Sequence, residues 1–75
     1  MTKTEKDVRE YLDKFMTKEQ IKEEQATTLT FSYLLGLPVE ECRGMCAESE
    51  MSRDELDQID DIEGIIWRIK RELEN

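Results

Sequence analysis

The alternation of apolar and polar residues predicts helices along most of the chain. In residues 4–16, apolar side chains recur every three or four positions, which indicates a helix with one buried face. Thr4 can cap this helix, and Asp7 occupies the position that carries Glu or Gln in a capping box. The buried face is expected to contain Val8, Tyr11, Leu12, Phe15 and Met16.

A second helix is predicted over residues 18–35, because Thr17 repeats the capping signal almost without a linker. Its second half also alternates as a half-buried strand would, with Leu29, Phe31, Tyr33 and Leu35 separated by polar residues or by Leu34. We favour a helix for residues 28–35, since no second convincing strand exists to pair with this one. Gly36 followed by Pro38 is also the usual sequence at a helix end.

Pro38 can open a third, short helix over residues 38–47. Cys42 and Cys46 would lie on one side of it, where small apolar side chains pack into a core. Two thiols at this spacing could also ligate a metal, but a structural zinc site needs four ligands and the chain has no His. An intrahelical disulfide would be strained. We therefore expect core residues, no metal and no cofactor.

The last and longest helix is predicted over residues 53–74. Ser52 and Glu55 form a capping box at its start. Isoleucines and a leucine then follow at spacings of three and four, as in a coiled-coil seam. The seam consists of Ile59, Ile62, Ile66, Ile69 and Leu73.

Together these patterns predict an all-α fold, a compact bundle of three to four helices. The 75 residues are enough for a single small domain, residues 1–75, with a thin core. The first, second and last helices are expected to provide that core. The third is expected to form a corner.

The net charge restricts the classes of function that this chain can have. Its 19 acidic and 11 basic side chains give a net charge of −8. Direct nucleic-acid binding is disfavoured, since phosphate contacts require Lys and Arg. Binding to an anionic membrane surface is disfavoured for the same reason, and no apolar run is long enough to span a bilayer. With two Cys and no signal-peptide pattern, a reducing, cytoplasmic location is expected.

The negative charge is concentrated in residues 48–63, where eight acidic side chains accompany only Arg53, for a net −7. One interpretation is a solvated helix start that complements the helix dipole. The other is an acidic ridge that binds a partner with a basic surface. The candidate partner-binding residues of this ridge are Glu50, Asp54, Asp57, Asp60 and Asp61.

A second candidate interface is apolar surface on the last helix. Its apolar side chains span a wider arc of the helix than three short partner helices are expected to cover. It comprises Ile62, Ile65, Trp67 and Ile69. Exposed apolar surface of this kind marks a partner or homodimer interface. Alternatively, Trp67 closes the bundle against Tyr11 or Tyr33.

The corner Leu35-Gly36-Leu37-Pro38 between two helices is similar to a helix-turn-helix. Its second helix, however, would present Glu40, Glu41 and Glu48, with Arg43 as the only cation for DNA. A plain structural corner fits these charges better.

No set of residues matches a known catalytic or phosphate-binding motif, so we do not expect an enzyme. The most suitable function is a non-catalytic interaction module: a small acidic regulator or inhibitor that occludes a basic surface, for example a nucleic-acid-binding one, on a larger protein. Phages and mobile elements often encode such proteins. The alternatives are a helix-turn-helix DNA-binding protein and a homo-oligomeric assembly component.

Overall fold

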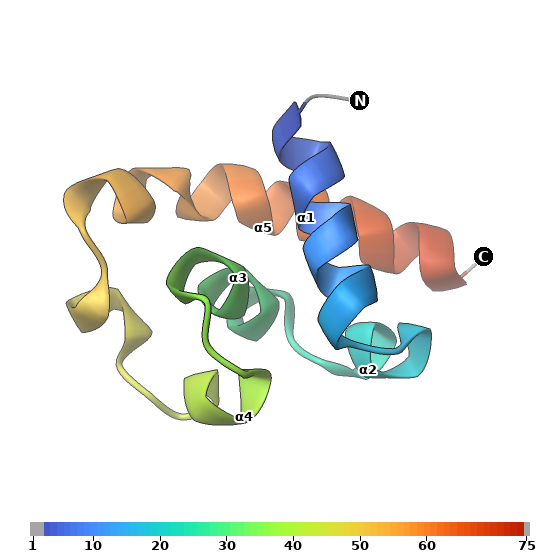
Figure 1. The fold of residues 1–75 in the computed structure, drawn as a ribbon, viewed down its shortest axis with the longest axis horizontal. Helices are drawn as coiled ribbons and strands as arrows, with labels where there is room; N and C mark the ends of the chain where they lie inside the picture. The colour runs from blue at the N-terminus through green and yellow to red at the C-terminus, as the bar shows by residue number, and fades with distance from the viewer. Residues whose placement is uncertain (1–2, 75) are drawn as a thin grey trace.

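A computed structural model describes residues 3–74 and shows a chain built from helices (Figure 1). They are α1 (Lys3–Phe15), α2 (Lys18–Glu23), α3 (Ala26–Leu35), α4 (Val39–Cys42), the 3₁₀ helix η1 (Ala47–Glu50) and α5 (Arg53–Glu74). No strand occurs among the described residues, so the all-α prediction is confirmed. Residues 28–35 lie within α3, which rules out the strand alternative.

The core lies where α1, α2 and α3 meet one side of α5. Figure 1 shows α1 crossing the long α5, and α1, α2 and α3 all contact that helix. The buried apolar side chains of the cluster are Val8, Leu12, Ile21, Ala26, Leu29, Ile62, Ile65, Ile66 and Ile69. Four of these nine residues belong to α5, which is therefore the scaffold on which the shorter helices pack.

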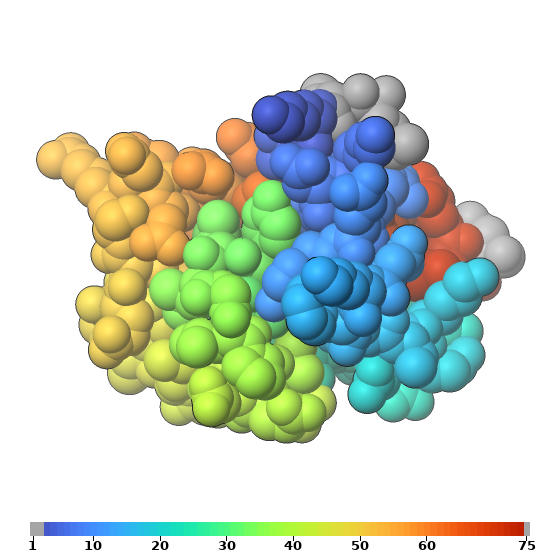
Figure 2. All heavy atoms as spheres, viewed as in Figure 1, coloured from blue at the N-terminus to red at the C-terminus, as the bar shows by residue number. Residues whose placement is uncertain are grey.

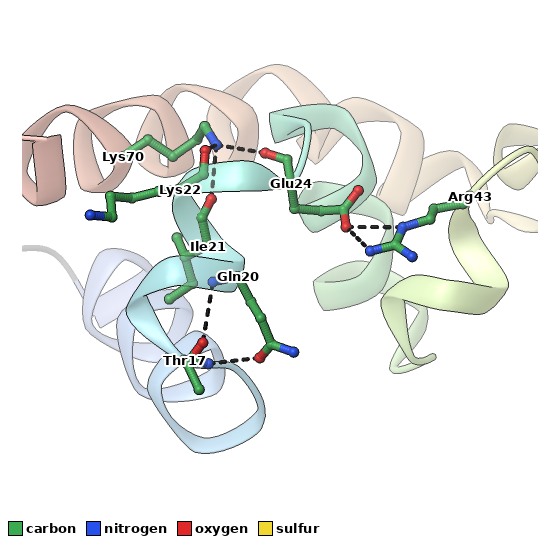
Figure 3. Close-up of polar contacts among 7 residues, drawn as sticks. All are labelled: Thr17, Gln20, Ile21, Lys22, Glu24, Arg43 and Lys70. Carbon is green, nitrogen blue, oxygen red and sulfur yellow. Dashed lines mark hydrogen bonds and ion pairs between the residues drawn. The ribbon is translucent and has the colours of Figure 1, made fainter.

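The prediction of one continuous helix over residues 18–35 was wrong, because the chain breaks between α2 and α3. Glu24 follows α2 in an extended conformation, with ψ of 147°. The Nζ atom of Lys70 donates hydrogen bonds to the carbonyl oxygens of Ile21 and Lys22, at 2.8 Å each, and to that of Glu24 (Figure 3). These oxygens lie in the last turn of α2 and just beyond it, where a helix end leaves carbonyl groups without intrahelical donors. Lys70 therefore caps α2 from α5.

The prediction of a helix over residues 38–47 was also wrong in extent. The helix after Pro38 ends at Cys42, and Gly44 follows in the left-handed region, with φ of +72°. By contrast, the predicted helix end at Gly36 is confirmed: its φ is +69°, and its N–H donates to the carbonyl oxygen of Ser32. Left-handed residues interrupt a right-handed helix, so the two glycines delimit the corner around α4.

Candidate functional site

The five predicted acidic residues all lie on the surface, on η1 and the first half of α5. We call Glu50, Asp54, Asp57, Asp60 and Asp61 the acidic face. The helix that carries four of them starts as predicted: Ser52 N–H donates to Glu55 Oε1 at 3.0 Å, and Glu55 N–H donates to Ser52 Oγ at 3.3 Å. This capping box engages Glu55 and fixes the start of the helix, so the acidic face projects from a rigid element. In Figure 2, residues 48–61 form the left edge of the molecule.

Within residues 3–74, no carboxylate of the acidic face accepts a hydrogen bond or forms an ion pair. The cations that do form ion pairs act elsewhere. Arg9 pairs with Glu5 and Glu72, Lys22 with Glu19, and Arg43 with Glu24. These carboxylates are therefore exposed to solvent without an ion-pair partner in the described part of the chain.

The apolar interface predicted on α5 is largely wrong, because the bundle covers most of it. Ile62, Ile65 and Ile69 are only 1%, 6% and 5% exposed, since three helices pack along this side of α5. Of the predicted set, Trp67 alone is exposed, at 57%. The isoleucines that suggested a homodimer interface are thus buried within the bundle and are not available at the surface.

Trp67 does not close the bundle against the tyrosines, as the alternative interpretation had it. Tyr11 and Tyr33 instead pack edge to face, with ring centroids 5.5 Å apart, and Tyr11 also contacts Phe15 at 4.8 Å. Phe15 was expected in the buried stripe of the first helix, but it is 61% exposed. Its ring contacts Tyr11 and otherwise remains largely at the surface.

The two cysteines have different environments, and core packing is correct for one of them only. Cys42 is buried, while Cys46 is exposed because the helix ends between them. Burial, with a smaller effect from the Glu41 carboxylate, raises the pKa of the Cys42 thiol. Among the described residues, no three His, Cys, Asp or Glu side chains are grouped closely enough to hold a metal ion.

The corner similar to a helix-turn-helix lacks a second helix long enough to read DNA. The candidate reading helix, α4, is only four residues long. Arg43, the one cation considered for a DNA contact, instead donates hydrogen bonds to the Glu24 carboxylate through both Nε and Nη2 (Figure 3). This pairing lowers the pKa of Glu24 and ties α4 to the link between α2 and α3.

Comparisons with known protein families, curated proteins and solved structures found no match to this chain. No helix in the described part of the chain has both the length and the apolar character needed to cross a membrane. The function proposed below therefore draws on the residues of this chain alone.

Proposed function

We propose that this protein is a non-catalytic interaction module that uses its acidic face to bind a basic surface on a larger protein. One observation carries the proposal: five exposed carboxylates project from η1 and α5, and no cation within residues 3–74 pairs with them. By occupying a basic surface, such as a nucleic-acid channel, the protein would act as a regulator or inhibitor. The proposed source is a phage or mobile element.

Uncompensated charge on a rigid helix favours fast and selective association. A patch of one sign raises the rate at which an oppositely charged partner arrives, and it disfavours partners of like charge. The core residues Ile62, Ile66 and Ile69 hold α5 against the rest of the bundle, so the carboxylates keep their spacing. Little conformational entropy is then lost when a partner binds.

Exposed apolar side chains on the same helix provide contacts that charge alone does not. Leu56 is 40% exposed and Trp67 is 57% exposed. From Leu56 to Asp60 is four residues and from Asp60 to Trp67 is seven, so the three share one side of α5. Trp is favoured among residues that contribute most to binding. We therefore include Trp67 in the proposed interface.

The experiment is a comparison of two variants that lose the same charge from different surfaces. Asp57→Asn/Asp61→Asn removes two charges from the acidic face, and Glu10→Gln/Asp13→Asn removes two from the exposed side of α1. Asp54 is left unchanged because it lies in the first turn of α5, where its negative charge interacts favourably with the positive end of the helix dipole and stabilises the helix. Each immobilised protein is used to capture partners from an extract of its native cell or host, and the captured proteins are quantified by mass spectrometry.

We expect wild type and the α1 variant to capture the same basic protein, and the acidic-face variant to capture much less of it. Release of that protein as salt concentration rises would support an electrostatic contact, because salt screens exposed charges. Equal capture by both variants would contradict the proposal.

A further inference from the structure

A continuous groove runs between the α1–α2 connection and the corner formed by α3 and α4. Its wider part has a volume of about 540 Å³ and its narrower part about 220 Å³. Both parts are lined by Met16, Gln20, Val39 and Glu40, so they form one surface. Figure 2 shows the hollow at the lower edge of the molecule, between residues 18–25 and residues 38–44.

The narrower part of the groove is apolar and has a fixed aromatic wall. Phe15 lines it with an exposed ring that contacts Tyr11 at 4.8 Å between centroids. The Tyr11 hydroxyl group is positioned by hydrogen bonds with Ser32, at 3.1 Å from both its carbonyl oxygen and its Oγ atom. Ser32 Oγ also donates to the carbonyl oxygen of Leu37 at 2.6 Å, which fixes the opposite side of the groove. The site is therefore preformed for an apolar side chain.

The wider part of the groove is acidic. Glu23, Glu24 and Glu40 line it together with one cation, Arg43, for a net lining charge of −2. Arg43 donates hydrogen bonds to Glu24, at 3.0 Å from its Nε atom. The exposed carboxylates of Glu23 and Glu40 have no hydrogen-bonded cation among residues 3–74. This end suits a basic side chain.

We propose that the groove binds a peptide segment of a partner protein, with an apolar or aromatic anchor beside Phe15 and an Arg or Lys beside Glu23 and Glu40. The charge of the lining selects a cation, and the apolar part next to it selects the anchor. A peptide segment suits this lining, because a mostly apolar part adjoins an acidic part and one segment can supply both an apolar and a basic side chain. The inference does not depend on the acidic face of α5.

The test is selection of a phage-displayed library of random short peptides against the whole protein. We expect the selected peptides to combine an apolar or aromatic residue with an Arg or Lys a few positions away. Their affinity should fall about tenfold in Phe15→Ala and in Glu23→Gln/Glu40→Gln, as expected when one anchor of a small interface is removed. The matched control is Glu10→Gln/Asp13→Asn, which removes two exposed charges from α1 outside the groove.

Four results would overturn the inference. The selection could enrich no peptide, or the enriched peptides could lack basic residues, or they could bind Phe15→Ala as tightly as wild type. Peptides that instead lose binding to Asp57→Asn/Asp61→Asn would also overturn it, and would assign binding to the acidic face. Because the groove and acidic-face variants share no residue, failure of this inference is distinguishable from failure of the proposed function.

Discussion

The ammonium group of Lys70 lies 2.8 Å from the carbonyl oxygen of Ile21, although the two residues are 49 positions apart in the sequence. The same group donates to the carbonyl oxygen of Glu24, whose carboxylate in turn accepts hydrogen bonds from Arg43 (Figure 3). A chain of polar contacts thus runs from α5 through the α2–α3 link to α4. It connects the helix that carries the acidic face with a wall of the groove.

Replacing Lys70 with Met should destabilise the protein by about 1–3 kcal/mol, because buried carbonyl groups at the end of α2 would lose their donor. The methionine retains most of the apolar stem, so the loss reports on the hydrogen bonds. Urea denaturation followed by circular dichroism measures the free energy of unfolding. Arg71→Met is the matched control on the exposed side of α5 and should change stability little. Equal stability of the two variants would show that Lys70 does not hold α2.

Two Gly→Ala substitutions should change stability in opposite directions. Gly36 has φ of +69° and open space around it, so Gly36→Ala should cost about 1–2 kcal/mol through backbone strain alone. Gly64 lies within α5, also with no atom near its added Cβ, and Gly64→Ala should stabilise by about 0.5–1 kcal/mol. Thermal or urea unfolding of both variants checks this. Stabilisation by Gly36→Ala would contradict the left-handed conformation of Gly36, and destabilisation by Gly64→Ala would contradict the open helical position of Gly64.

Acid should weaken the ion pair between Glu24 and Arg43. Hydrogen bonding to Arg43 lowers the pKa of Glu24 below its ordinary value of 4.5, and the Lys70 charge adds to this. Because the folded-state pKa is the lower one, the stabilisation is complete above 4.5 and is lost as pH falls through the folded-state value. The contribution is small, since Arg43 is largely exposed and water screens the pair.

The measurement compares unfolding of wild type and Glu24→Gln from neutral pH to below 4.5. Glutamine keeps an acceptor for Arg43 but does not titrate, so wild type should lose more stability on acidification. Parallel pH profiles for the two proteins would contradict the assignment.

The two thiols should differ in reactivity. Cys46 is exposed and should react readily with an alkylating reagent in the native protein. Cys42 should react only on unfolding, since burial both shields its thiol and raises its pKa, which lowers the thiolate fraction. Mass spectrometry of the native protein should show one modification, absent in Cys46→Ser and retained in Cys42→Ala. Two rapid modifications would contradict the burial of Cys42.

Local signals in the sequence predicted much of the fold. Ser52 and Glu55 marked the start of α5, and Gly36 marked the end of α3, because capping depends on residues only a few positions apart. Asp54, Asp57 and Asp61 were likewise expected at the surface, because helical spacing places them opposite Ile59 and Ile66.

Apart from the early end of the helix after Pro38, which involves the nearby Gly44, the failures involve contacts between residues distant in sequence. The break after Glu24 depends on Lys70, which no local pattern reveals. Burial of Ile65 and Ile69 requires that three helices pack on α5, and the exposure of Phe15 likewise depends on how the helices are arranged in space. The groove follows from the same arrangement, so Phe15, Glu23 and Glu40 were missed as site residues.

The most direct test of the central claim is the rate at which the captured basic partner associates with the protein. Rates are measured by surface-based kinetics for wild type, Asp57→Asn/Asp61→Asn and Glu10→Gln/Asp13→Asn over a series of salt concentrations. We expect the acidic-face variant to associate about tenfold more slowly at low salt, with a weaker dependence on salt, while the α1 variant stays close to wild type. Identical association rates for the two variants would contradict the assignment of the acidic face as the partner-binding surface.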